Sequence, residues 1–296
     1  MRKPARGVVG VGVVVALASV HARVRPVHAQ PTRAQPNQAQ LTHARSIQAA
    51  LSRALRETQA TAVVLDVRTG AVLASEGRAR RGSPGSAIKP LLLAYALGHG
   101  IVRPETEVYC RRDLHVGPHS LPCTHPADHP VFRAQSALAE SCNTWFAEMA
   151  RHFDDLALES ALQGTHLPHA SVLAAGVEQR ELVVLGLRGV TASPPELARA
   201  YREMLEQMPP NGPVARGLEE SVEFGMAHPA QVPGVQILGK TGTATNPGEA
   251  WTHGWFAGAL PGRLIIVVYV PRGDGGTAAG LARMFFASVV SQDKAQ

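Results

Sequence analysis

The feature that most restricts the fold of this chain is the placement of its predicted strands, which lie at both ends of one region. Apolar segments bounded by turn residues predict strands over residues 61–67, 71–75, 234–245, 251–262 and 263–273. Helical patterns fill most of the remainder, over residues 46–59, 86–100, 133–153, 193–208 and 275–292. This order predicts an α/β (α+β) domain. Its central antiparallel sheet of about five strands is built from both ends of the domain and covered by helices, with a mostly helical subdomain inserted.

Lysine is scarce in this chain. Among 29 Lys and Arg residues only four are lysines, at positions 3, 89, 240 and 294. Arg stays protonated at ordinary pH, whereas a buried Lys can lose its proton and act as a base. Lys89 follows Ser86 by three residues in a predicted helix, so its amine shares a face with the Ser86 hydroxyl. Burial and a second cation nearby would lower the pKa of Lys89 from about 10.4 toward roughly 7–8, as a general base requires.

Two further short elements could meet this pair. Ser141-Cys142-Asn143 is a weak signal on its own. Lys240-Thr241-Gly242-Thr243 falls on a predicted strand, where the glycine lets a ligand backbone approach closely. Lys240 would supply a positive charge for a carboxylate and also serve as the second cation that lowers the pKa of Lys89. The two lysines inside the predicted domain thus fall in two of the three elements.

In this order the three elements resemble the S-x-x-K, S-x-N and K-T-G motifs of the penicillin-binding transpeptidases and serine β-lactamases. The resemblance covers about residues 46–290. It includes longer blocks: PGSAIKPLLLAYALGHGIVRPETEVYC, ALAESCNTWFAEMA, which is similar to the second-motif helix of the family, GVTASPPELARAYREM, and GKTGTA followed by HGWFAG. A central sheet with an inserted helical subdomain is the fold that this resemblance implies.

The resemblance implies catalytic roles for the matched residues. Ser86 would attack a carbonyl carbon and form an acyl-enzyme, with Lys89 as its general base. Ser141 would relay a proton to the leaving amine. The backbone N–H groups of Ser86 and Thr243 would form the oxyanion hole, in which one donor is typically worth about 2.7–4 kcal/mol.

The resemblance implies substrate-binding roles as well. Asn143 would hold the amide of the substrate. Thr241 and Thr243 would bind its terminal carboxylate, beside Lys240 and Gly242 on the same strand.

The activity implied is that of a serine acyl-transferase acting on D-Ala-D-Ala peptidoglycan stem peptides, as a D,D-transpeptidase or a D,D-carboxypeptidase. β-Lactams would acylate it covalently. The resemblance calls for no cofactor and no metal. Expected partners are the peptidoglycan stem peptide, β-lactams as covalent inhibitors, and cell-wall assembly proteins.

The start of the chain is typical of an export signal. A basic MRKPAR segment precedes an apolar run of 14 residues, which is short for a membrane span, and Val27-His28-Ala29 fits a cleavage site. We expect a signal peptide over 1–29, or an uncleaved anchor there, then a polar Pro/Gln linker over 30–45 and the catalytic domain over 46–296. The domain would then be periplasmic or otherwise extracytoplasmic.

The charge of the chain argues against a nucleic-acid partner. Formal net charge is +6, but residues 1–29 carry five basic residues and no acidic one. Without them 24 basic and 23 acidic residues remain, with no basic patch.

Two other functions stay open. A serine β-lactamase needs a base that activates water against the acyl-enzyme. Glu178 and Glu181 lie in about the right stretch for one, although their segment reads more simply as a solvated helix or loop. Class D β-lactamases use a carboxylated Lys as this base, usually with Ser-x-Val as the second motif and a Trp near the segment that follows. They are disfavoured here, because the second motif is Ser-Cys-Asn and residues 165–200 contain no Trp. A non-catalytic penicillin-binding or cell-wall-sensing module is the third candidate, and the complete set of motifs speaks against it.

The segment 110–130 is rich in Cys and His. A metal site is conceivable there, yet the spacings match no standard zinc pattern, so we assign no metal ligand. In an exported protein two nearby cysteines more often form a disulfide, and in the resembled family a Cys pair often closes this loop. We therefore expect a disulfide between Cys110 and Cys123, with Cys142 as a buried apolar thiol that faces away from Ser141 and Asn143 if the segment is helical.

Overall fold

The computed structural model describes residues 38–293. Its central sheet is antiparallel throughout and has the strand order β2-β1-β9-β8-β7. The N-terminal hairpin supplies β1 (Thr61–Asp66) and β2 (Val72–Glu76), and the C-terminal part supplies β7 (Leu238–Ala244), β8 (His253–Leu260) and β9 (Leu264–Val270). The prediction of a five-stranded sheet built from both ends of the domain is confirmed. Its closing contact is the pairing of β1 with β9.

Both faces of the sheet are covered, because successive side chains of a strand point to opposite sides. On β1 and β9, Val64 and Ile266 lie in one apolar cluster with α1 (Gln38–Ala54) and α9 (Gly275–Asp293). Val63 and Val267 lie in the other cluster, with α7 (Pro194–Gln207) and the helical region. Strands β8 and β9 are therefore buried along their whole length.

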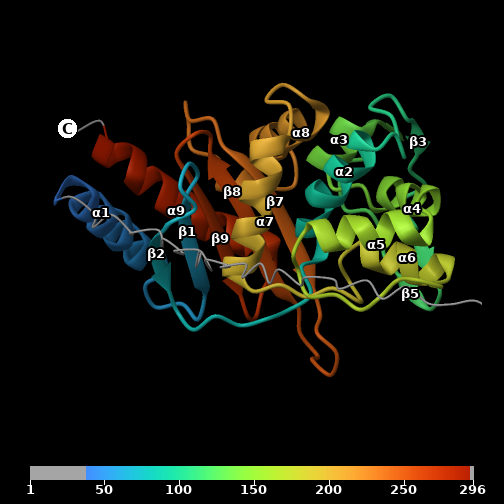
Figure 1. Ribbon diagram of the computed structural model, residues 1–296, viewed down its shortest axis with the longest axis horizontal. Helices are drawn as coiled ribbons and strands as arrows, with labels where there is room; N and C mark the ends of the chain where they lie inside the picture. Colours follow the sequence, from blue (N-terminus) through green and yellow to red (C-terminus); the bar gives the residue numbers. More distant parts are fainter. Residues whose placement is uncertain (1–37, 294–296) are drawn as a thin grey trace, which may run out of the picture. The chain divides into compact units, whose positions relative to one another are not determined.

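The helical region lies between β2 and β7 in the sequence. It contains η1 (Gly85–Ile88), α2 (Lys89–Gly98), α3 (Ala134–Ala139), α4 (Asn143–His152), α5 (Asp155–Gly164), α6 (Val177–Val184), α8 (Pro213–Glu223) and η2 (His228–Ala230). Two-residue strands interrupt the loop that follows α2: β3 (Val108–Tyr109) pairs with β6 (Val131–Phe132), and β4 (His115–Val116) pairs with β5 (His119–Ser120). Figure 1 shows α2 to α6 grouped together beyond β7.

The helix over 86–100 begins as the short turn η1 and continues as α2, with Pro90 in its first turn. A proline there costs little, since the first N–H groups of a helix have no partner within it. Helix α2 ends at Gly98, two residues before the end of the predicted helix at Gly100.

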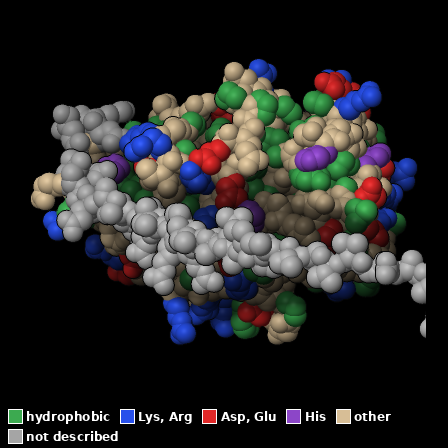
Figure 2. Space-filling model, in the orientation of Figure 1, with side chains coloured by type: hydrophobic (Ala, Val, Ile, Leu, Met, Phe, Trp, Pro, Cys, Tyr) green, Lys and Arg blue, Asp and Glu red, His purple; other side chains and the backbone are tan. Residues whose placement is uncertain are grey.

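The predicted signal peptide over 1–29 lies outside the described residues, as does the first part of the predicted linker. Helix α1 begins at Gln38, within the segment 30–45 that we expected to be linker. Within residues 38–293, no helix has both the length and the apolar character needed to cross a membrane. Basic and acidic side chains both occur on the face shown in Figure 2, in keeping with the near balance of charge outside residues 1–29.

Candidate active site

The turn that carries Ser86 packs directly on strand β7. Gly85 has a φ of +52°, and a Cβ built on it would lie 2.5 Å from the carbonyl oxygen of Thr243. A Cβ on Gly242 would in turn collide with the carbonyl oxygen of Pro84. Only glycine fits this conformation and this approach. Ser86 is partly exposed while the residues on either side of it are buried, so it is the accessible residue of this part of the turn.

Three side chains from distant parts of the sequence hold this turn by its carbonyl groups. The Ser83 carbonyl accepts hydrogen bonds from His253 Nε2 at 2.8 Å and Trp255 Nε1 at 2.9 Å. The Ala87 carbonyl accepts one from the Tyr201 hydroxyl at 2.6 Å. Because a carbonyl can only accept, His253 carries its proton on Nε2, and burial lowers its pKa. From the sequence, Trp255 could be a core residue or a wall of the cleft, and Tyr201 and His253 had no assigned role, although all three lie in the blocks HGWFAG and GVTASPPELARAYREM; Trp255 is fully buried.

Lys89 connects the first and second motifs. Its side chain is fully buried, and its Nζ lies 3.0 Å from the Ser141 carbonyl, 3.3 Å from Ser141 Oγ and 2.7 Å from Asn143 Oδ1. Burial disfavours the charged amine and lowers the pKa of Lys89 to about 8. The shift has the expected direction, but burial is its only lowering cause, and the expected lowering by Lys240 is not found. A fraction of this lysine is consequently free base at neutral pH.

The second motif lies in a turn, which corrects the expectation of a continuous helix through residues 141–143. Helix α3 ends at Ala139, Ser141 adopts a left-handed φ of +58°, and Asn143 begins α4. Residues two apart on one helix do not share a face. The turn is what allows Ser141 and Asn143 both to reach Lys89. A left-handed conformation at a residue other than glycine costs about 1–3 kcal/mol, and such strain persists where the surrounding structure enforces it.

The third motif lies on β7, the edge strand next to the Ser86 turn. Lys240 is fully buried, and its Nζ donates to the Thr241 carbonyl at 3.3 Å. Burial lowers the pKa of Lys240 well below its usual value, and repulsion from Lys89 adds to the effect. The two lysines therefore lie near one another, as the sequence predicted. Thr243 is exposed, and its hydroxyl accepts from the Gly275 N–H at 2.9 Å.

Comparison with known proteins agrees with this geometry. The family model for the penicillin binding protein transpeptidase domain matches residues 60–211. The chain belongs to the penicillin-binding protein transpeptidase family. This membership supports an acyl-transfer enzyme that takes part in peptidoglycan synthesis. The matched span includes the first two motifs but ends before Lys240. The third motif is therefore assigned from its place on strand β7, next to the turn that carries Ser86.

Solved structures of transpeptidases share the fold. The D,D-transpeptidase domain of a peptidoglycan glycosyltransferase from Eggerthella lenta superposes with a TM-score of 0.71 at 17% identity, covering 85% of this chain and 82% of that one. A peptidoglycan glycosyltransferase from Burkholderia ambifaria gives 0.68 at 21% identity, covering 88% and 96%. Pseudomonas aeruginosa PBP2 in complex with WCK 5153 gives 0.68 at 17%, covering 83% and 73%. A search of curated protein sequences found no match.

The two carboxylates considered for a β-lactamase are engaged elsewhere in this transpeptidase domain. The Glu181 carboxylate is buried and accepts a hydrogen bond from Arg151 Nε at 2.7 Å. The Glu178 carboxylate lies against Gly117, in the turn between β4 and β5. Neither contact involves a residue of the three motifs, so neither side chain gains support as a water-activating base.

The predicted disulfide between Cys110 and Cys123 is not present. Both cysteines are buried free thiols in the structure, and so is Cys142. Cys142 is buried as expected, but its sulfur lies 4.0 Å from that of Cys123 rather than among apolar side chains alone. The four-residue cluster to which these thiols belong is treated below.

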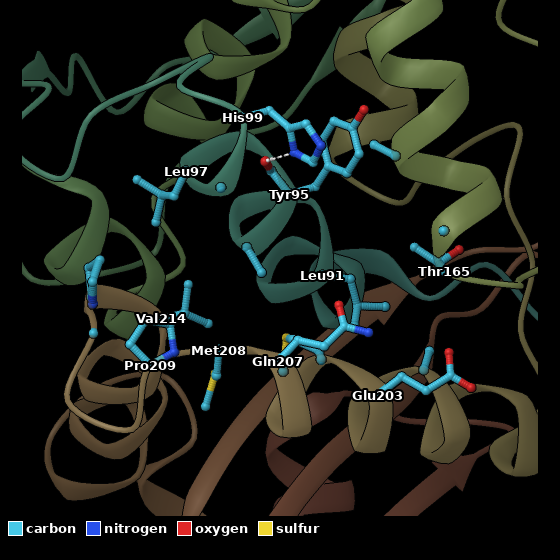
Figure 3. Close-up of a pocket in the computed structure, with 18 of the residues that line it drawn as sticks. Leu91, Tyr95, Leu97, His99, Thr165, Glu203, Gln207, Met208, Pro209 and Val214 are labelled. Atoms are coloured by element: carbon cyan, nitrogen blue, oxygen red, sulfur yellow. Dashed lines mark hydrogen bonds between the residues drawn. The ribbon is translucent and has the colours of Figure 1, made fainter.

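A cavity of about 460 Å³ lies beside helix α2, and the three motifs do not line it. Its walls are formed by α2 on one side and by α5, α7 and the loop after α7 on the other. Figure 3 shows Leu91, Met208 and Val214 on its walls. The Tyr95 ring stacks on His99 at 3.8 Å on the same side. Because none of the residues of the three motifs lines this cavity, it is separate from the candidate active site.

Proposed function

We propose that this protein is a serine acyl-transferase that acts on D-Ala-D-Ala stem peptides of peptidoglycan and that β-lactams acylate at Ser86. One observation carries the proposal: the amine of Lys89, three residues after Ser86 in the chain, is fully buried and meets Ser141 and Asn143. A buried lysine whose pKa is about 8 suits a base that takes a proton from a serine hydroxyl. Family membership supports the same chemistry.

In the proposed acylation step, Ser86 Oγ attacks the carbonyl carbon of the penultimate D-Ala as its proton passes to Lys89. The negative charge that develops on the carbonyl oxygen is stabilised by the backbone N–H groups of Ser86 and Thr243. Close packing of Gly85 on β7 supports this assignment, because it brings the two backbone segments together. The tetrahedral intermediate then collapses. The C–N bond breaks, the terminal D-Ala leaves as an amine, and Ser141 relays the proton it takes up.

Substrate binding would use the exposed side of the third motif. β7 lies at the edge of the sheet, where a peptide can lie alongside it as an added strand. Thr243 is exposed there, whereas Thr241 is almost buried and its hydroxyl lies 3.4 Å from the Met226 carbonyl. We assign the main contact with the terminal carboxylate to Thr243, with charge from Lys240 behind it, and the contact with the substrate amide to Asn143.

The second half-reaction decides between two activities. Transfer of the acyl group from Ser86 to an amine makes a crosslink, whereas transfer to water makes a carboxypeptidase. Either activity places the domain outside the cytoplasm, where an export signal over 1–29 would deliver it, within reach of cell-wall assembly proteins.

The test incubates the purified chain with a pentapeptide stem substrate, with and without an acceptor amine, and measures released D-Ala and crosslinked dimer. Release of D-Ala that disappears in Ser86→Ala is expected. The Ser83→Ala variant keeps the backbone carbonyl that His253 and Trp255 bind, so it serves as the matched serine control. Absence of both products, together with absence of any β-lactam adduct, would favour a non-catalytic module instead.

A further inference from the structure

Four buried metal-ligating side chains gather behind the second motif. Cys110 follows β3, Cys123 and His125 lie in the loop after β5, and Cys142 lies between Ser141 and Asn143. One ligand atom from each lies within 4.8 Å of the others, and all four residues are buried. The chain thus brings together side chains that are spread over residues 110–142.

The spacing within the cluster fits a tetrahedral metal site. Zinc binds thiolate sulfur at about 2.3 Å and imidazole nitrogen at about 2.0–2.1 Å, so neighbouring ligand atoms around it lie roughly 3.5–3.8 Å apart. The Cys110 sulfur lies 3.4 Å from His125 Nε2, and the Cys123 sulfur lies 4.0 Å from that of Cys142. A disulfide requires about 2.05 Å between sulfurs. It would also use only two of the three thiols and leave His125 Nε2 without a role.

The orientation of His125 favours a ligand role for Nε2. Its Nδ1 lies 2.8 Å from the Pro126 carbonyl, and because a carbonyl only accepts, Nδ1 carries the proton of the neutral ring. The lone pair of Nε2 then points to the sulfur atoms. Glu140 stands behind the ring: its Oε2 is 3.8 Å from Nδ1 and buried without a hydrogen-bond partner. A backbone carbonyl or a carboxylate behind a histidine is how metal-binding histidines are usually oriented.

The loop that carries two of the ligands is held in place by its own contacts. Arg112 donates to the His125 carbonyl at 2.6 Å and to the Cys123 carbonyl at 3.3 Å. The Cys123 N–H donates to the Arg112 carbonyl at 2.8 Å. The Thr144 hydroxyl lies 3.4 Å from the Cys110 sulfur, where it can donate to a thiolate. These contacts hold the loop and the ligand side chains in place around the cluster.

We propose that Cys110, Cys123, Cys142 and His125 bind one structural Zn²⁺, and that this ion holds the turn carrying Ser141 and Asn143 against Lys89. Three thiols and one imidazole in a closed tetrahedral set are the donors that zinc takes in structural sites. Binding would release the three thiol protons to solvent. Because Cys142 separates the two polar residues of the second motif, the ion would tie that motif directly to the loop over 110–125. This site takes the place of the disulfide that we expected from the sequence.

The first test measures metal in the full-length protein, purified without chelators. About one zinc ion per chain is expected. Replacement of zinc by Co²⁺ should give a tetrahedral spectrum with intense sulfur-to-cobalt charge-transfer bands. The protein is also denatured in the presence of a chelator, without reductant, and then alkylated. All three cysteines should be modified. Two results would overturn the proposal: far less than one zinc ion per chain after incubation with Zn²⁺, or a peptide in which a disulfide links Cys110 and Cys123.

The second test asks what the ion does for the active site. His125→Ala should lose zinc, whereas His115→Ala, which removes an exposed histidine of the same segment, should keep it. Labelling of Ser86 by fluorescent penicillin should be slow in metal-depleted protein and recover on addition of Zn²⁺, but should not recover in His125→Ala. If the variant fails to fold, depletion and recovery in the unchanged chain still give the answer. Labelling at the same rate with and without zinc would refute the proposed effect on the turn.

Discussion

The amine nitrogen of Lys89 lies 2.7 Å from Oδ1 of Asn143, and Ser141 supplies its carbonyl and its hydroxyl to the same amine. A protonated lysine has three hydrogens, one for each of these acceptors. The neutral amine has two hydrogens and a lone pair, so it can donate to at most two of these acceptors. Loss of the proton at Lys89 therefore gives up one of the three contacts and leaves a lone pair for the proposed transfer from Ser86.

The first prediction concerns the two lysines. Lys89→Met removes the base without burying a new charge and should slow acylation of Ser86 by about 10²–10⁴-fold, the usual contribution of a positioned acid or base. Lys89→Arg should be similarly impaired, because a guanidinium does not give up its proton. The measurement is the rate of labelling by a fluorescent β-lactam, with thermal unfolding to check the fold.

Lys240→Arg is the matched control for that prediction. It keeps the positive charge that a carboxylate needs, so its loss in labelling rate should be smaller than that of Lys89→Arg. An equal loss in the two arginine variants would show that the division of roles between base and fixed charge is wrong.

The second prediction is a pH dependence. Since burial lowers the pKa of Lys89 to about 8, the amine is mostly protonated below pH 8 and mostly free base above it. If the free base takes the serine proton, the acylation rate should fall about tenfold for each pH unit below 8 and level off above it. Rates measured between pH 6 and 9.5 with a neutral acylating agent would test this. A rate that does not change across this range would contradict the role of Lys89.

Much of this fold could be predicted from local patterns in the sequence. The run of apolar residues in β1 predicts a strand, and neighbours in a strand point to opposite faces of the sheet. Val63 and Val64 accordingly lie in the two different apolar clusters. The turn at Arg68-Thr69-Gly70 and the stop at Gly98 follow from residues whose backbone preferences are strong. Lys89 and Lys240 stood out because the chain uses so few lysines.

The remaining features depend on contacts that no local pattern specifies. Tyr201 reaches the Ala87 carbonyl from 114 residues away, and a hydroxyl inside an amphipathic helix gives no sign of its partner. The left-handed Ser141 breaks a helical pattern that is locally favourable, since tertiary contacts to Lys89 outweigh its cost. The cysteine cluster closes only when three separate segments pack together, so the order of its residues in the chain resembles no zinc motif.

The third prediction tests the support of the nucleophile turn. Tyr201→Phe removes the hydroxyl that donates to the Ala87 carbonyl at 2.6 Å, in a site where the tyrosine is almost completely buried. An unpaired buried carbonyl costs about 1–3 kcal/mol, so the free energy of unfolding in urea should fall by that amount. Ser86 labelling should slow at the same time. Tyr109→Phe, at a position that is 63% exposed, is the control and should change neither quantity.

The fourth prediction concerns the approach of the turn to β7. Gly85→Ala places a methyl group 2.5 Å from the Thr243 carbonyl and forces alanine into a left-handed conformation. The conformation costs about 1–2 kcal/mol and overpacking typically about 1–3 kcal/mol more. The variant should be destabilised and should acylate slowly. Gly98→Ala, at the end of α2 with open space around it, should be neutral or stabilise by up to about 1 kcal/mol. Similar behaviour of the two variants would show that the close approach does not matter.

The last prediction separates a transpeptidase from a β-lactamase by the lifetime of the acyl-enzyme. Acylation needs Ser86, Lys89 and the oxyanion donors, but fast hydrolysis needs a further base aimed at a water molecule. Glu181 is paired with Arg151, and Glu178 packs against Gly117. Intact-mass spectrometry after incubation with penicillin should therefore show one persistent adduct that maps to Ser86 and is absent in Ser86→Ala. Glu181→Gln should leave its lifetime unchanged. Rapid turnover of the drug without a trapped adduct would make the protein a β-lactamase, and an adduct on another residue would show that the motif assignment is wrong.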